Sequence, residues 1–334
     1  MKEIMVLGGG GVGTMAAVNL QCGQKAAVTM VLRSNYNRAV EDGYHITSVD
    51  HGEIVGWRPT TVLNRVPEHT GKPFDFVVVT TKNIPDAYPT VVHLIRPAIV
   101  PGKTVIVLIQ NGYNIEKPIF EAFPQNKCLS GVSMITCREL ELGVIDQDGE
   151  DQLAIGAFCN PNLSWEDQVQ TAHEFVDIYS AGGKTNCNYD ADFNFSRWRK
   201  LVNNACLNTI CALTDLDTGR IRLAGGLVDN LIRPAMQEVL AAARACGVTL
   251  PDDLIDFMLE ADPLDLYIAP SMLEDARKGN LVEVEVILGE PLREGLARNI
   301  PMPNLTVVYH LLKALQWGRL EKRGAIEIPP KRVC

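Results

Sequence analysis

Residues 2–22 read KEIMVLGGGGVGTMAAVNLQC, an apolar run that leads through four glycines into a segment of helical periodicity. Within it, Gly8, Gly10 and Gly13 fit the pattern GxGxxG between a predicted strand and a predicted helix. In that setting the first glycine permits a tight turn, the second lets a pyrophosphate approach the backbone, and the third lets helix and strand pack closely. The turn therefore predicts a dinucleotide site at the positive end of the helix, made by Gly8, Gly10, Gly11, Val12 and Gly13. The alternative is a glycine turn with only a structural role.

Short β-branched runs alternate with helical segments in the first third of the chain. The predicted strands are residues 4–7, 27–32, 76–80 and 104–109, and the predicted helices are residues 12–22 and 85–100. This alternation is typical of βαβ units and a parallel sheet. Farther along we expect strands at 131–136 and 152–155, and a helix at 164–180 that Ser164 caps and Gly182-Gly183 ends.

The pattern changes near residue 190 to longer apolar-periodic segments, at residues 195–213, 227–246, 252–259 and 304–317. Their period indicates helices. The predicted fold is α/β, with an N-terminal Rossmann-type parallel sheet domain at 1–190 and a C-terminal all-helical domain at 191–334. Residues 282–286 (VEVEV) are an exception, because their period of two predicts a strand.

The composition excludes several classes of protein. The 334 residues are 46% hydrophobic, enough for a sizeable core, and a net charge of −9 argues against nucleic acid as a partner. Nine scattered cysteines without a CxxC pair, and a first strand that leaves no room for a cleavable signal, predict a reducing, cytoplasmic location. No apolar run approaches the roughly 18 residues that cross a membrane. Six histidines far apart, with no HExxH, give no indication of a metal.

The end of the second predicted strand bears on the choice of cofactor. An acidic residue there binds the ribose 2′-hydroxyl of NAD, whereas a cation accommodates the 2′-phosphate of NADP. Here the strand ends in Arg33-Ser34, with no acidic residue before Glu41. The expected cofactor is therefore NADPH, bound in part by Arg33. The alternative is a solvated surface arginine.

Two further strand ends should meet at the same edge of the sheet, because ligands of open α/β sheets bind at the carboxyl ends of the strands. One ends in Thr80-Thr81-Lys82 and the other in Gln110-Asn111-Gly112. Lys82 is a candidate contact for the adenosine end of the cofactor or a solvated lysine. Asn111 is a candidate ligand contact or part of a plain Asn-Gly turn.

A polar stripe lies on an otherwise apolar helix in the second half of the chain. Lys200, Asn204 and Asn208 are four residues apart and share one face of the predicted helix. Asparagine is a poor helix former and is costly to bury unpaired, so the stripe suggests a polar ligand opposite it. The alternative is a polar face that only meets water.

Together these landmarks resemble the ketopantoate reductase family. The resemblance is carried by the glycine turn, Arg33, Lys82, Asn111-Gly112, the WRKL segment at 198–201 with its two trailing asparagines, and Ser271-Met272-Leu273 followed by Glu283. Each piece is weak alone, but their order and the Ser-to-Glu spacing are specific. One departure is Leu288, which stands where an asparagine commonly precedes Gly289.

The resemblance implies a Rossmann domain joined to an all-helical domain, with the substrate between them. It makes Lys200 the general acid, and Glu283 a residue that assists the lysine or binds the substrate hydroxyl. The substrate-binding residues it implies are Asn111, Asn204, Asn208 and Ser271, and Asn111 is also expected at the cofactor. It further implies that residues 282–286 are helical, against their period-two pattern. Without the resemblance, Ser271 could be only a helix cap and Glu283 only a surface carboxylate.

The expected function is NADPH-dependent reduction of a small 2-keto acid, with 2-dehydropantoate (ketopantoate), reduced to pantoate, as the first candidate. A positioned ammonium such as Lys200 can stabilise the charge that grows on the carbonyl oxygen and then give up a proton. One alternative is another 2-keto acid or opine-type dehydrogenase on the same fold, and another is a non-catalytic NADPH-binding sensor. The sequence leaves a homodimer open.

Overall fold

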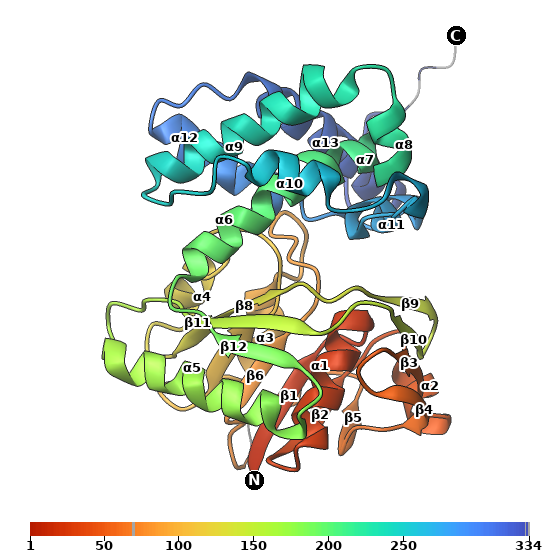
Figure 1. Cartoon of the computed structure of the whole chain (residues 1–334). Coiled ribbons are helices and arrows are strands. Elements are labelled where there is room, and N and C mark those ends of the chain that lie inside the picture. Colours follow the sequence, from red (N-terminus) through yellow and green to blue (C-terminus); the bar gives the residue numbers. More distant parts are fainter. Residues whose placement is uncertain (69–70, 331, 333–334) are drawn as a thin grey trace. The chain divides into compact units, whose positions relative to one another are not determined.

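The chain forms two compact units in the computed structural model (Figure 1), which describes residues 1–68, 71–330 and 332. His69 and Cys334, members of the histidine and cysteine sets above, lie outside the described residues. Unit 1 contains Met1–Asn83, Ala87–Gln110 and Ile115–Phe193, and unit 2 contains Ile84–Asp86, Asn111–Asn114 and Asn194–Cys334. Two short loops from the first part of the chain are therefore counted with unit 2.

Unit 1 is built on an eight-stranded sheet with the order β12-β11-β8-β7-β6-β1-β2-β5. Its strands are β1 (Lys2–Leu7), β2 (Ala26–Val31), β5 (Thr61–Leu63), β6 (Phe76–Val79), β7 (Val105–Leu108), β8 (Cys128–Ser133), β11 (Gln152–Ala157) and β12 (Asn186–Tyr189). All neighbours pair in parallel except β8 and β11, which are antiparallel. The predicted Rossmann-type parallel sheet is confirmed.

The central strands are buried on both faces, which explains their continuous apolar sequences. In β1, Ile4 and Val6 belong to the hydrophobic core that also contains residues of helices α1 (Gly11–Cys22) and α5 (Trp165–Tyr179), while Met5 and Leu7, which alternate with them, are buried as well. The Ser164 cap of α5 is confirmed, because its side chain accepts a hydrogen bond from Asp167 N.

The remaining helices of unit 1 are short. They are α2 (Tyr36–Glu41), α3 (Val91–Ile95), the 3-10 turn Arg96–Ala98, α4 (Lys117–Ala122) and the 3-10 turn Ser180–Gly182. The single helix predicted at 85–100 is wrong, since only its second half is helical. Pro85 and Pro89 lack a backbone N–H and disfavour helical geometry in the preceding residue, so the helix begins after them.

A second sheet of four strands, which the sequence pattern did not predict, also belongs to unit 1. Its order is β4-β3-β10-β9, with β3 (Tyr44–Ser48), β4 (Gly52–Trp57), β9 (Cys137–Glu141) and β10 (Val144–Gln147). Tyr44, Ile46 and Ile145 join the core of unit 1 from this sheet. Of this sheet, β9 and β10 pack against α1.

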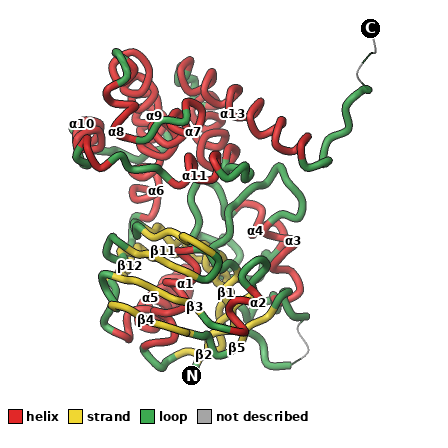
Figure 2. The backbone as a smooth tube through the Cα atoms, turned by 90° about the vertical axis from the view of Figure 1, so that its right-hand side faces the viewer, coloured by secondary structure: helices red, strands yellow, loops and turns green. Residues whose placement is uncertain are grey.

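In unit 2 the regular elements of the described residues are all helical, and strands appear only in unit 1 (Figure 2). They are α6 (Phe193–Asn203), α7 (Thr209–Thr214), α8 (Thr218–Leu223), α9 (Arg233–Ala245), α10 (Leu254–Glu260), the 3-10 turn Leu264–Leu266, α11 (Ser271–Arg277), α12 (Glu290–Ala297) and α13 (Pro303–Lys322). The predicted helical second half is confirmed.

Three π-helical segments interrupt these helices: η3 (Asn204–Asn208), η4 (Val228–Ile232) and η6 (Glu285–Gly289). Such bulges are rare and often mark functional sites. The strand predicted at 282–286 is wrong. The helix implied by the resemblance is correct from Val284 onward, whereas Val282 and Glu283 precede it in an irregular segment. Tertiary burial of the apolar side chains overrides a short period-two pattern.

Candidate active site

The glycine turn in unit 1 has the geometry of a cradle for an anion. Gly8 has φ +118°, and a Cβ added there would lie 2.7 Å from Thr80 Oγ1. A Cβ on Gly13 would lie 2.3 Å from Gly8 O, so helix α1 packs directly on the turn. A Cβ on Gly10 would meet no heavy atom within 4 Å, so this side of the turn is open. Gly11 and Val12 begin α1, and the turn as a whole fits a pyrophosphate at a helix N-terminus.

Arg33 is exposed just beyond the carboxyl end of β2. Two residues later Asn35 is buried, and its Nδ2 donates hydrogen bonds to Gly9 O at 2.8 Å and to Glu139 Oε1 at 2.5 Å. Burial raises the pKa of Tyr44, also beside Gly9, to about 12. Neither residue could be predicted from the sequence pattern: Tyr44 belongs to the unpredicted second sheet, and Asn35 is also bound by Glu139 of that sheet.

Lys82 is exposed beyond β6, and the end of that strand is linked to the end of β7. Gln110 Nε2 donates to Thr81 O at 2.5 Å, and Asn83 Nδ2 donates to Gln110 Oε1 at 3.4 Å. These amides hold the two strand ends side by side at the carboxyl edge of the sheet. The expectation that both ends point to one edge agrees with the parallel pairing of β6 and β7.

The Asn111-Gly112 segment is anchored within unit 2. Asn111 Nδ2 lies 3.5 Å from Glu283 Oε2, and Glu283 is only 4% exposed, so it is not a surface carboxylate. Gly112 has φ +101°, and a Cβ there would lie 2.6 Å from Val286 Cβ. The buried Arg197 donates to Gly112 O at 2.8 Å. The turn therefore needs glycine for both its backbone angle and its contact with η6.

The predicted polar stripe runs from α6 into the π-helical segment η3. Lys200 is half-buried near the end of α6, and Asn204 is 9% exposed, which argues against a stripe that only meets water. Asn208 Nδ2 donates to Asn204 Oδ1 at 2.8 Å. The π-turn widens the helix at these two amides, and the pair presents one fixed arrangement of donor and acceptor.

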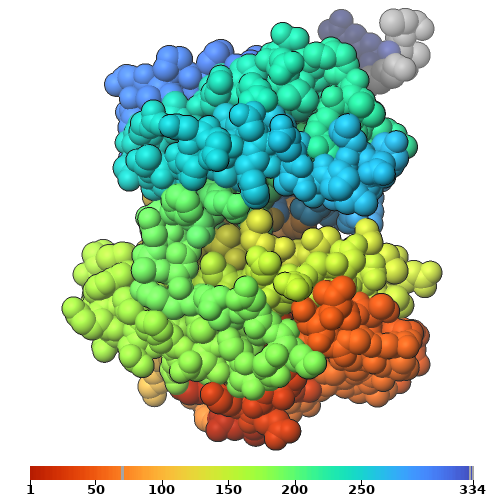
Figure 3. Space-filling view, viewed as in Figure 1, coloured from red at the N-terminus to blue at the C-terminus, as the bar shows by residue number. Residues whose placement is uncertain are grey.

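Ser271 is exposed as the first residue of α11, with Pro270 as the N-cap. The residues before it form a surface segment, and Figure 3 shows this part of unit 2 in cyan and light blue at the surface. Leu264, Leu266 and Tyr267 are large exposed apolar side chains of that segment. Of the site residues predicted in unit 2, the structure joins Asn111 to Glu283 and Asn204 to Asn208, whereas Ser271 lies on an exposed helix start.

A charged cluster surrounds the helix that follows Glu283. Glu285 Oε1 lies 2.8 Å from Lys313 Nζ and accepts from Tyr309 OH at 2.9 Å, and Arg293 binds Glu285 Oε2 at 2.9 Å. Burial alone would raise the pKa of Glu285, but the hydrogen bonds from Lys313, Arg293 and Tyr309 outweigh burial and lower it. Lys313 also binds Asp86 at 2.8 Å. Glu285 is thus held as a carboxylate.

Over the described ranges, no three His, Cys, Asp or Glu residues are grouped so that they could hold a metal ion. None of the helices in the described part of the chain is long and apolar enough to cross a membrane.

A dinucleotide-type glycine turn on a parallel sheet, together with a helical unit that carries a lysine, amides and a buried glutamate, defines the class of two-domain nucleotide-dependent oxidoreductases. Residues 4–160 match the family profile described as Ketopantoate reductase PanE/ApbA, and residues 192–316 match Ketopantoate reductase PanE/ApbA C terminal. The chain belongs to the ketopantoate reductase family. The predicted family and the predicted oxidoreductase class are confirmed.

Individual relatives cover nearly the whole chain. The chain is 34% identical to an uncharacterized protein of Saccharomyces cerevisiae, over 99% of this chain and 98% of that protein. It is 27% identical to a 2-dehydropantoate 2-reductase of Nostoc, over 94% of this chain and 95% of the relative. The crystal structure of 2-dehydropantoate 2-reductase from Methylococcus capsulatus is similar with a TM-score of 0.78 at 29% identity, over 95% and 97% of the two chains.

Proposed function

We propose that this protein reduces a small 2-keto acid with NADPH, and that 2-dehydropantoate, which becomes pantoate, is its substrate. The observation that carries the proposal is the buried Glu283 beside Asn111 in a chain that also holds Lys200, Asn204 and Asn208 on one helical face. Burying a carboxylate lowers the stability of the fold unless the carboxylate is paired, so a buried glutamate at this position supports a functional role.

The cofactor part of the proposal rests on the glycine turn. The open side of Gly10 would admit the pyrophosphate, and the N-terminus of α1 would face its charge. Arg33 and Lys82 are exposed cations at neighbouring strand ends, and Arg33 would bind the 2′-phosphate that distinguishes NADPH from NADH. When bound, the nicotinamide supplies the hydride for the reduction.

The acid–base part of the proposal assigns Lys200 as the general acid. Its ammonium would stabilise the negative charge on the substrate carbonyl oxygen and would then donate a proton to it. Glu283 would favour the charged ammonium and orient it, or would bind the hydroxyl of the product. Because Glu283 is fixed by burial rather than exposed, it can hold one orientation through the reaction.

The substrate would be held by amides and a hydroxyl. Asn111, Asn204 and Asn208 would bind the carboxylate and hydroxyl groups, and Ser271 would add a donor from the start of α11. Leu288, the departure from the family pattern, is fully buried in η6. Its side chain therefore contributes to the packing of η6. The domain boundary near residue 190, the cytoplasmic location and a homodimer stay predictions.

The test is the oxidation of NADPH by the purified full chain with a panel of 2-keto acids that includes ketopantoate. We expect the highest kcat/KM with ketopantoate, loss of turnover in Lys200→Ala, and wild-type turnover in the control Lys278→Ala, which removes an exposed lysine of unit 2. A higher kcat/KM with another 2-keto acid would identify a different dehydrogenase. NADPH binding without turnover of any panel member would favour the sensor.

A further inference from the structure

Gln316, on the last long helix, binds the main chain immediately before Glu283. The side chain is 1% exposed and extends from α13 to Val282. Val282 N donates to Gln316 Oε1 at 3.0 Å, and Gln316 Nε2 donates to Val282 O at 3.0 Å. One carboxamide therefore satisfies both peptide groups of Val282, as a neighbouring strand would.

The segment that Gln316 holds is irregular and buried, which makes such pairing necessary. Val282 and Glu283 lie outside helical structure, yet they are 1% and 4% exposed. A buried peptide group without a partner is costly. Val282 O accepts from Val284 N at 2.9 Å as well as from Gln316 Nε2, whereas Val282 N donates to the Gln316 side chain, which supplies the bond that a helix would otherwise make. On the other side of Glu283, its own carbonyl accepts from Ile287 N at 3.2 Å. The Cα of Glu283 is thus fixed from both directions.

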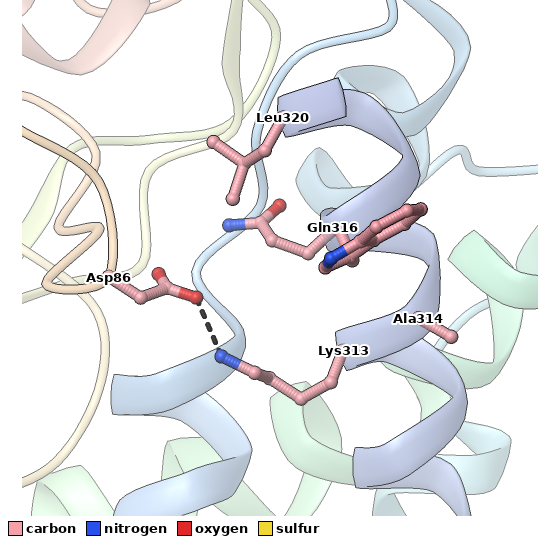
Figure 4. A pocket seen from close by; sticks show the side chains of 6 residues that line it. Asp86, Lys313, Ala314, Gln316 and Leu320 are labelled. Atoms are coloured by element: carbon pink, nitrogen blue, oxygen red, sulfur yellow. Dashed lines mark hydrogen bonds and ion pairs between the residues drawn. The ribbon is translucent and has the colours of Figure 1, made fainter. Parts of the chain in front are cut away.

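The same face of α13 also binds Glu285, two positions after Glu283. Tyr309, Lys313 and Gln316 are spaced by four and three residues, so they share one helical face. Tyr309 and Lys313 both bind the carboxylate of Glu285, and Gln316 binds Val282. Figure 4 shows Lys313 and Gln316 projecting toward the same side of α13, beside a hollow of about 310 Å³ that Asp86 and Leu320 also line.

We propose that Gln316 is a positioning residue for Glu283: by binding both peptide groups of Val282 it sets where the buried carboxylate of Glu283 lies relative to Asn111. Gln316 acts through the main chain and touches no reacting atom. The proposal rests on the proposed function, in which Glu283 works with Lys200. Loss of the carboxamide would let the 281–283 segment shift, and a displacement near 1 Å in a catalytic group can cost on the order of 100-fold in rate.

Unit 1 offers a matched control with the same chemistry. The buried Gln168 accepts from Asn160 N at 2.8 Å and donates from Nε2 to Asn160 O at 3.1 Å. A change of Gln168→Met therefore removes the same pair of bonds from a buried main-chain residue that does not adjoin Glu283, and with them the longer bonds from Nε2 to Leu163 O at 3.3 Å and Ser164 O at 3.2 Å. It measures the general cost of losing such a carboxamide.

The experiment compares Gln316→Met with Gln168→Met in the full chain, each alone and in a Glu283→Ala background, by kcat and by the KM for ketopantoate and NADPH. We expect Gln316→Met to lower kcat roughly 10- to 100-fold with the KM for NADPH unchanged, and to cause no further loss once Glu283 is absent. Gln168→Met should leave kcat unchanged. An equal kcat loss in Gln168→Met, or an undiminished loss from Gln316→Met in the Glu283→Ala background, would overturn the proposal.

A second variant and a second readout keep the test decisive. Gln316→Glu keeps a donor and an acceptor only while its carboxyl is protonated, so its kcat relative to wild type should rise as the pH falls. Hydrogen exchange of the peptide that covers residues 281–287 requires no turnover, so it separates the positioning claim from the proposed function. If the wild type reduces no 2-keto acid, the proposed function fails. Exchange that is on the order of five- to tenfold faster in Gln316→Met alone then supports the positioning role, and unchanged exchange overturns it.

Discussion

Replacing Gly10 by alanine should separate cofactor binding from stability. Gly10 has φ −75° and ψ −176°, an extended conformation that any residue adopts, and an added Cβ would meet no heavy atom within 4 Å. Gly10→Ala should therefore change the free energy of unfolding little: the lost freedom of the unfolded chain favours folding by about 0.4–1 kcal/mol, but Gly10 is the N-cap of α1, where alanine is less favourable than glycine by about the same amount. The Tm without ligand should therefore stay within roughly 2 °C of the wild-type value.

The same methyl group would occupy the place that the pyrophosphate must approach. Each hydrogen bond lost from the turn to a charged phosphate should cost about 1.5–3 kcal/mol, which corresponds to roughly 10- to 100-fold in the Kd for NADPH. The assays are a fluorescence titration with NADPH and thermal unfolding without ligand. Gly13→Ala is the contrasting variant, because its Cβ would lie 2.3 Å from Gly8 O and should lower Tm. Wild-type NADPH affinity in a folded Gly10→Ala protein would refute the assignment of the turn.

Three further predictions concern the cofactor, the substrate and pH. Arg33→Asp should narrow the preference for NADPH over NADH in kcat/KM, and a wild type that uses both equally would contradict the role of Arg33. Asn204→Ala and Asn208→Ala should raise the KM for ketopantoate or lower kcat with little change in the Kd for NADPH; an equal loss of NADPH affinity would assign them to the cofactor or the fold. Burial lowers the pKa of His51, whose Nε2 lies 2.8 Å from Asn19 Oδ1, so protonation favours the unfolded chain and the free energy of unfolding should decrease as pH falls below about 6.5, the ordinary value. His51→Gln should flatten that decrease in chemical denaturation, and an identical pH profile would exclude His51 as its source.

The parallel sheet could be predicted because its strands are buried on both faces and read as continuous apolar runs. The second sheet could not. Arg138, Glu139 and Asp146 make β9 and β10 polar, so the pair lacks the apolar alternation of a half-buried hairpin. The sheet is completed by the pairing of β10 with the distant β3. Sequence periodicity reports only local alternation, whereas the pairing that joins the two hairpins of this sheet, β10 with β3, links residues about a hundred positions apart in the chain.

In the candidate site, too, only the features set by local spacing could be predicted from the sequence pattern. Lys200, Asn204 and Asn208 could be selected from their spacing, because one helical face brings them together. The π-helical turn at Asn204 could not, since five residues are too few to separate a wider helical period from the ordinary one. The resemblance, not the local pattern, pointed to Glu283, and Gln316 could only be found from its contact with Val282 across the fold.

The kcat of Lys200→Ala with NADPH and ketopantoate tests the central claim most directly. A positioned proton donor contributes about 10²- to 10⁴-fold, so the variant should lose at least that order of turnover while it stays folded and binds NADPH. Arginine should not restore the activity, because a guanidinium stays protonated and has a different geometry. The Lys200→Ala/Glu283→Ala double variant should lose less kcat than the losses of the two single variants combined, since the two residues act as one unit. Near-normal turnover in Lys200→Ala would contradict the account.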